Sequence, residues 1–126
     1  MKYLFILHLL LVAVMYGCRD VSPDPVQAFI PGTCIRFSQH EFGNEYDTLI
    51  ISIQNESADE YGIIRKWKYE RVIDGQKLEP EYKRSVTTAQ YVSKHKLLRE
   101  YETGSIYSFD VTEKIMFNGP IKYKKL

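Results

Sequence analysis

After about residue 28 the chain alternates short apolar runs with tight turns, and it shows no long apolar period of 3.6 residues. This alternation is typical of strands joined as an antiparallel meander. Aromatic residues, which strands favour, make up 13% of the chain. The expected strands are 33–40, 47–54, 61–73, 82–92, 96–102, 105–111, 114–118 and 121–126. The sequence therefore predicts an all-β fold, an antiparallel meander of seven to eight strands closing as a small up-and-down barrel.

The turn at Asp74-Gly75 is a signal for a two-residue hairpin loop, which would place Trp67 opposite Tyr82. The same register would set like charges opposite each other, Arg65 with Arg84 and Lys66 with Lys83. Like charges in directly opposed positions destabilise a sheet. A bulge near Pro80 would shift the register and relieve this repulsion.

A second tight hairpin is expected at Thr103-Gly104. It would place Leu98 opposite Phe109 and Glu100 opposite Tyr107. Tyr107, Phe109 and Val111 then share one apolar face, which we expect to point into the barrel.

The N-terminus has the organisation of a secretory leader. A short positive start, Met1-Lys2-Tyr3, precedes residues 4–16, which are apolar except for His8. Thirteen residues rise about 20 Å as a helix, which is short of the ~30 Å hydrocarbon core of a bilayer. We therefore expect a signal helix rather than a permanent transmembrane helix.

The end of this leader, Met15-Tyr16-Gly17-Cys18, resembles the lipobox of bacterial lipoproteins. In that family the cysteine thiol receives a diacylglyceryl group, and a peptidase cuts the chain just before it. The resemblance implies a signal peptide at 1–17, lipidated Cys18 with a tether at 18–27, and a domain at 28–126. The expected location is the bacterial cell envelope, in the outer membrane on its periplasmic or surface face. The alternative is an ordinary signal peptide in which Cys18 has no role.

Charge and cysteine content narrow the function classes. The net charge is +1, and the excess charge is Lys2, which leaves with the leader. A neutral domain argues against nucleic acid as a partner. If Cys18 is lipidated, Cys34 has no disulfide partner, and we expect it to be a small buried strand residue.

Motifs of catalysis and cofactor binding are missing from the sequence. It holds no nucleophile elbow, no phosphate-binding loop and no dinucleotide fingerprint. His40-Glu41, Glu45 and His95 are too loosely spaced for a zinc motif. We therefore expect no enzyme activity, catalytic residue, cofactor or metal.

One strand carries a candidate ligand-binding face. Residues at alternate positions of the expected strand 61–73, with two residues of the next strand, combine aromatic rings with cations: Arg65, Trp67, Tyr69, Arg71, Tyr82 and Arg84. Inside a barrel they would form an aromatic cavity with cationic ends, suited to an amphipathic anion such as a fatty acid. The alternative is that Trp67 belongs to the core and the arginines reach the rim, because so small a barrel has little interior room.

The domain resembles lipocalin-like proteins at three places. Ile30-Pro31-Gly32-Thr33-Cys34 followed by a strand is similar to their opening strand, and 121–126 is similar to their closing strand. The segment 47–71 with Trp67 is similar to small lipocalin-like lipoproteins of Gram-negative bacteria. The resemblance covers about residues 28 to 126 and implies a mostly non-enzymatic up-and-down barrel.

Two functions follow as hypotheses. In the first, a membrane-anchored lipoprotein binds a small hydrophobic or amphipathic ligand beside Trp67. In the second, the barrel is filled, and an exposed aromatic or edge-strand surface binds a protein partner whose identity the sequence does not show.

Overall fold

The computed structural model describes residues 23–126, so the expected signal peptide and Cys18 lie outside the described part. One short helix is followed by strands only. In chain order the elements are α2 (Pro25–Phe29), β1 (Gly32–His40), β2 (Gly43–Asn55), β3 (Glu60–Ile73), β4 (Gln76–Lys77), β5 (Glu81–Val92), β6 (Leu97–Glu100), β7 (Ile106–Asp110), β8 (Ile115–Asn118) and β9 (Ile121–Lys125). Between residues 23 and 126, no helix has the length and apolar character needed to cross a bilayer.

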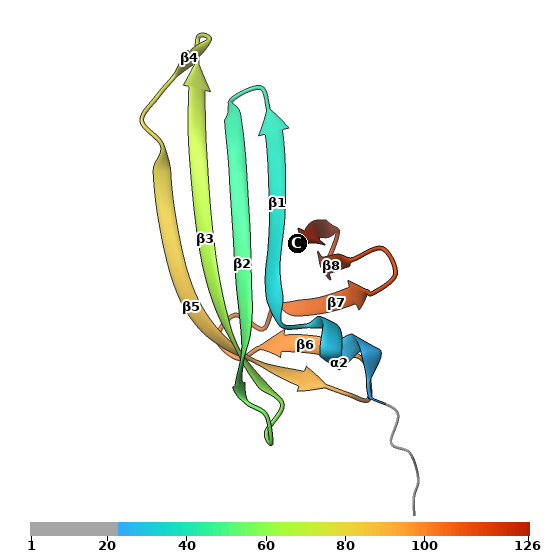
Figure 1. Cartoon of the computed structure of the whole chain (residues 1–126). Coiled ribbons are helices and arrows are strands. Elements are labelled where there is room, and N and C mark those ends of the chain that lie inside the picture. The colour runs from blue at the N-terminus through green and yellow to red at the C-terminus, as the bar shows by residue number, and fades with distance from the viewer. Residues whose placement is uncertain (1–22) are drawn as a thin grey trace, which may run out of the picture.

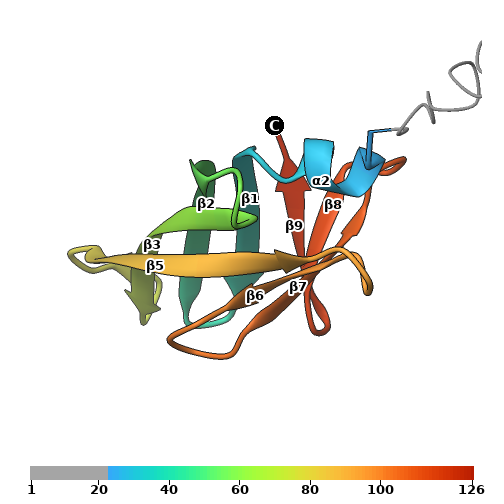
Figure 2. The same ribbon diagram turned by 90° about the horizontal axis from the view of Figure 1, so that it is seen from below.

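The strands close into one antiparallel barrel. Strands that follow one another in the chain pair with each other, except that β5 pairs with β3 instead of β4, and β9 returns to β1 with Lys125 opposite Cys34. The short strand β4 pairs only with the end of β3 and extends that hairpin, so eight strands form the barrel wall. Figure 2 shows the strands arranged around the barrel. The predicted all-β up-and-down barrel is confirmed.

The strands are unequal in length, and the longer ones extend past the end of the barrel. β2, β3 and β5 have 13, 14 and 12 residues, whereas β6 has four. β9 pairs with β1 only at Cys34 and Ile35, and β6 pairs with β5 only from Ala89 to Val92. The far ends of β1, β2, β3 and β5 therefore continue beyond the barrel as a four-stranded sheet (Figure 1). We call this extension, residues 36–48, 66–77 and 81–86, the blade.

The interior of the barrel is occupied by side chains. Its buried apolar core consists of Ile30, Cys34, Leu49, Ile51, Tyr61, Ile63, Ala89, Tyr91, Leu98, Tyr107, Met116 and Tyr123. Along β2, burial alternates residue by residue from Asp47 to Ile51, the period of a strand with one face inward. Cys34 is 2% exposed, which confirms that it is a small buried strand residue.

The register between β3 and β5 differs from the expected one by one residue. The loop at Asp74-Gly75 is the predicted two-residue hairpin, with positive φ at both positions, and it pairs Ile73 with Gln76. The chain then leaves the ladder around Pro80, and β5 returns with Trp67 opposite Lys83 instead of Tyr82. The predicted bulge is present, but a shift of one residue moves every side chain of β5 to the face opposite the expected one.

The second hairpin also has a shifted register, with a milder consequence. Leu98 lies opposite Tyr107 instead of Phe109, because the loop after Glu100 is longer than the expected two-residue turn. A shift of two residues keeps every side chain on its face. Leu98, Glu100 and Tyr107 are accordingly all buried.

The helix α2 lies at the barrel end opposite the blade tip (Figure 1). Asp24 caps it by accepting from the backbone N–H of Val26 at 3.0 Å. The other carboxylate oxygen of Asp24 accepts from Tyr91 Oη at 2.6 Å and from Lys96 Nζ at 2.8 Å. Residues 24–27, which the sequence assigned to the tether, are therefore folded onto the barrel.

Acid is expected to loosen α2 from the barrel. Hydrogen bonds from Lys96 and Tyr91 lower the pKa of Asp24 from 3.8 to about 2. Because the folded-state pKa lies below the unfolded value, the stabilisation is complete above about pH 4 and is lost as the pH falls toward about 2. The amide of Ala28 donates to the Asp24 carbonyl, so its hydrogen-exchange protection should fall over this window. An Asp24→Asn variant should show low protection at every pH, and a wild-type profile without this step would contradict the assignment.

Candidate functional site

The inner face of the blade carries a stack of rings. Trp67 and Tyr69 stack with ring centroids 5.7 Å apart, and His40 stacks on Tyr69 at 5.9 Å. Trp67 Nε1 donates to Glu45 Oε1 at 2.7 Å, and Lys83 Nζ lies 5.1 Å from the Trp67 ring centroid. The indole is therefore held from three sides, by a ring, a carboxylate and a cation.

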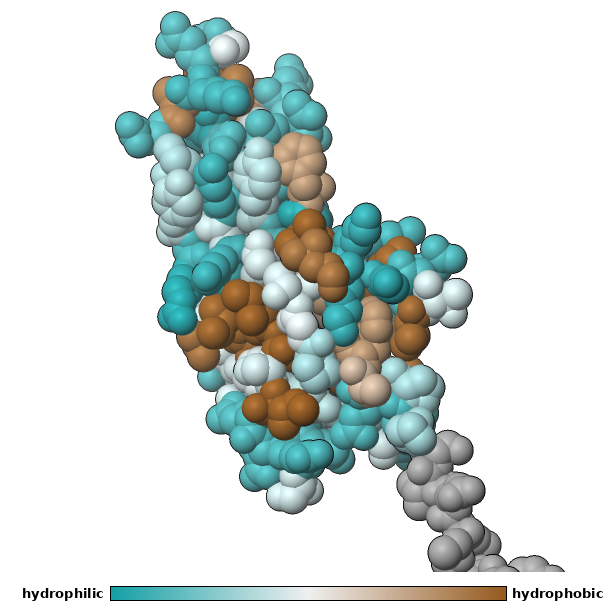
Figure 3. Space-filling model, in the orientation of Figure 1, coloured by the Kyte–Doolittle hydropathy of each residue, from teal (hydrophilic) through white to brown (hydrophobic). Residues whose placement is uncertain are grey.

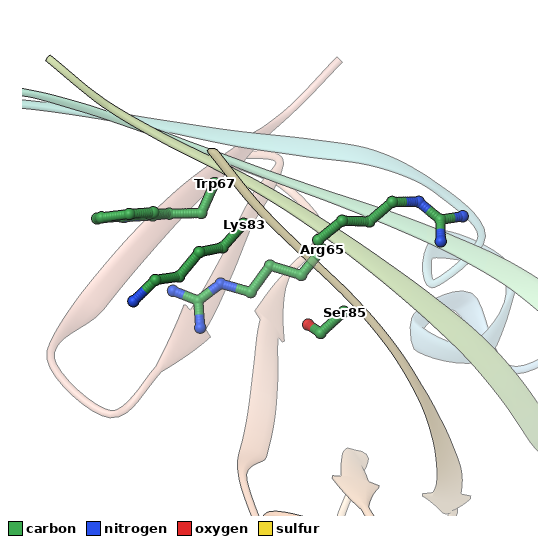
Figure 4. Close-up of a pocket in the computed structure, with 5 residues that line it drawn as sticks. Arg65, Trp67, Lys83 and Ser85 are labelled. Carbon is green, nitrogen blue, oxygen red and sulfur yellow. The ribbon is translucent and has the colours of Figure 1, made fainter. Parts of the chain in front are cut away.

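An open groove of about 480 Å³ runs beside this stack at the edge of the blade. Arg65, Trp67, Lys83, Arg84 and Ser85 line it. Figure 4 shows the side chains of Trp67 and Lys83 extending in the same direction from their strands. The groove is formed by β3 and β5 alone, so it belongs to the blade and not to the barrel interior.

At the base of the blade, Arg65 is held by a buried carboxylate. Asp47 is 1% exposed and accepts from Arg65 Nη2 at 2.6 Å and from Tyr123 Oη at 2.8 Å. The hydrogen bonds to Asp47 raise the pKa of Arg65 above its ordinary value, so its guanidinium stays charged. Burial first, and then the bond to Asp47, raises the pKa of Tyr123. This network joins β2, β3 and β9 where the blade leaves the barrel.

The outer face of the blade carries a row of side chains across its four strands. The register aligns Phe37, Tyr46, Lys68 and Tyr82 in directly opposed positions. The rings of Phe37 and Tyr46 lie 4.9 Å apart, and Lys68 Nζ lies 5.2 Å from the Tyr46 ring. Phe37 and Tyr82 are 56% and 69% exposed, so the row is open to solvent.

A second groove, of about 530 Å³, lies on this outer face. Its lining includes both tyrosines of the row and the neighbouring cations: Tyr46, Thr48, Lys66, Trp67, Lys68, Tyr82, Lys83 and Arg84. Lys66 and Arg84 stand directly opposite each other on β3 and β5. Among the described residues neither of them makes an ion pair, whereas Lys68 pairs with Glu70 at 2.7 Å. The outer groove thus contains an uncompensated pair of like charges.

The structure divides the six predicted ligand residues between two faces. Arg65, Trp67, Tyr69 and Arg71 alternate along β3, which places them on one face, with Arg71 near Glu81 at 3.6 Å. Tyr82 and Arg84 lie opposite Lys68 and Lys66, on the other face. The six residues therefore do not form the single ligand-binding face that was expected, because the bulge around Pro80 shifts β5 by one residue.

Several residues of these surfaces were not predicted from the sequence. On the inner face they are Lys83, Glu45 and His40, and on the outer face they are Phe37, Tyr46, Lys66 and Lys68. The sequence contained part of the information needed to find them, because the like charges opposed in the expected register indicated a bulge near Pro80. Strand β2 also begins at Gly43, before the expected start at residue 47, and pairs there with His40.

The described residues offer little for metal binding or nucleophilic catalysis. Within 23–126, no three His, Cys, Asp or Glu side chains gather closely enough to hold a metal ion. Burial raises the pKa of the Cys34 thiol, which makes it a poor nucleophile.

Apolar side chains are exposed on both the barrel and the blade. In Figure 3, apolar residues gather over the barrel, and smaller apolar patches mark the tip of the blade. Phe42, Ile73 and Leu78 near the tip are 64%, 49% and 44% exposed.

No protein-family model, curated protein or solved structure matches this chain.

Proposed function

We propose that this protein is a bacterial envelope lipoprotein, anchored through Cys18, whose blade binds a protein partner. The observation that carries the proposal is the blade, a four-stranded sheet in which the outer edges of β1 beyond Ile35 and of β5 before Thr88 have no paired strand in the described chain. Free edges and exposed aromatic side chains are features of binding surfaces, since isolated edges otherwise favour aggregation.

The position of the blade relative to the N-terminus supports this function. The helix α2 and the blade tip lie at opposite ends of the molecule (Figure 1). The segment from Cys18 to Pro23 spans at most about 18 Å. A lipid on Cys18 would hold the α2 end near the bilayer and direct the blade away from it, toward a partner.

The occupied interior favours partner binding over storage of a lipid inside the barrel. Leu98, Ala89 and Met116 are fully buried, and the buried side-chain polar atoms among the described residues are all hydrogen-bonded. The groove beside Trp67 opens on the blade, where a small ligand would contact only two strands. A ligand in that groove is compatible with a binding surface, but it would not be enclosed as in a storage protein.

Position-specific cross-linking in cells tests the proposal. A photo-reactive amino acid at Phe42, on the blade, should give one defined protein adduct in the full-length chain. The same group at Ile106, which is 50% exposed on β7, is the matched control and should give none. A Cys18→Ser change should release the protein from the membrane fraction. Equal adducts from both positions, no adduct from Phe42, or a Cys18→Ser protein that stays with membranes would each contradict the proposal.

A further inference from the structure

The exposed segment of β5 in the blade has an open backbone edge. The carbonyl of Thr88 accepts from Tyr101 N–H at 2.9 Å, on the side of β5 away from β3. The N–H and C=O of one residue point to the same side of a strand, and this side alternates along the chain. The backbone groups of Tyr82, Arg84 and Val86 therefore point to the side where β6 has already ended. At these three residues, which alternate along β5, the backbone N–H and C=O groups are available to hydrogen-bond an added strand.

The two grooves of the blade lie on opposite faces of this same edge. Lys83 and Arg84 line both grooves, whereas Ser85 lines only the inner one and Tyr82 only the outer one. A strand paired to β5 would send its side chains alternately to the two faces. Successive side chains of that strand would thus reach one groove and then the other.

Both grooves are cationic at the points that such a strand would reach. On the outer face, Arg84 stands opposite Lys66, and neither has an acidic partner among the described residues. On the inner face, Lys83 lies over the Trp67 ring, and Glu81, at the start of β5, is already near Arg71. A carboxylate beside Arg84 would relieve the like-charge repulsion with Lys66, which gives an acidic strand a favourable contact on each face.

We propose that the β5 edge of the blade binds an extended acidic segment of the partner protein as an added antiparallel or parallel strand. This inference rests on the proposed function and specifies its partner. A second copy of the chain is a poor occupant, because pairing two β5 edges would bring the cations Lys83 and Arg84 of both copies close together. The charges on this edge thus oppose self-association and select an acidic strand.

A peptide titration tests this contact with the full-length protein in detergent micelles. The probe is a short synthetic peptide of repeated Thr-Thr-Glu-Glu, which places glutamate on both faces of a strand, and the control peptide has lysine in place of glutamate. We expect the acidic peptide to bind and to protect the amides of Tyr82, Arg84 and Val86 from hydrogen exchange, and we expect the lysine peptide not to bind.

Substitutions at the edge distinguish a loss of peptide binding from a loss of folding. Lys66→Glu should weaken peptide binding about tenfold while the melting temperature stays equal or rises, since the introduced carboxylate would face Arg84. Val86→Pro removes a backbone N–H that points to the open edge and should also weaken binding. Lys122→Glu, on β9, is the matched charge control and should leave binding unchanged. A loss of binding in Arg84→Glu with retained β-sheet circular dichroism would give the same answer if Val86→Pro fails to fold.

Several outcomes would overturn the inference. These are no binding of the acidic peptide at millimolar concentration, protection at β1 instead of β5, or binding unaffected by Lys66→Glu. Tighter binding of phosphatidylglycerol vesicles than of the peptide at this edge would assign the site to lipid and also overturn it. The peptide assay needs neither the anchor nor a cellular partner, so its failure is distinguishable from a failure of the cross-linking experiment.

Discussion

Asp47→Ala is expected to reduce the free energy of unfolding by about 3 kcal/mol. Asp47 is buried and accepts hydrogen bonds from both Arg65 and Tyr123. Its removal would leave the buried hydroxyl of Tyr123 without this acceptor and would free the guanidinium of Arg65. Urea unfolding, followed by circular dichroism and extrapolated linearly to water, measures the change.

The matched control is Asp47→Asn, which keeps the volume and one acceptor oxygen but removes the charge. We expect it to cost roughly half as much as Asp47→Ala, since Tyr123 can still donate to the amide oxygen. If both variants unfold within about 0.5 kcal/mol of the wild type, the network does not hold the blade to the barrel.

Leu98→Ala should destabilise the protein by about 3 kcal/mol as well, for a different reason. Leu98 is fully buried on β6, and truncation removes apolar contacts and leaves a cavity that the short strands cannot easily fill. Leu78→Ala is the control, because Leu78 is 44% exposed near the blade tip. Its expected effect is below about 0.5 kcal/mol. Similar losses for both leucines would show that the blade belongs to the cooperative core.

The local features of the fold were predictable from the sequence. Asp74 and Gly75 adopt positive φ, which the type I′ hairpin needs and which these residue types tolerate. Strand alternation also predicted that Arg65, Trp67 and Tyr69 share one face of β3, because the side-chain period of a strand is two. These properties depend on residues that are close in the chain.

The candidate site was predictable only in part. Its arginine and aromatic residues on β3 were correctly placed on one face, but Tyr82 and Arg84 were placed on that face as well. A one-residue bulge around Pro80 puts them on the outer face, where Arg84 meets Lys66. The like-charge conflict in the sequence indicated that a shift was needed, but it did not give the number of residues.

The all-β class, the Asp74-Gly75 turn, the alternation along the strands and the burial of Cys34 follow from the sequence alone. The size of the bulge around Pro80 and the early ends of β6 and β9, which leave the blade with its open β5 edge, depend on the three-dimensional fold. The physical reason is that strand period and turn conformation are local, whereas barrel closure depends on pairs far apart in the chain, such as Cys34 with Lys125. Where those distant pairs stop, the outer edges of β1 and β5 have no paired strand, and an edge suited to a partner is left.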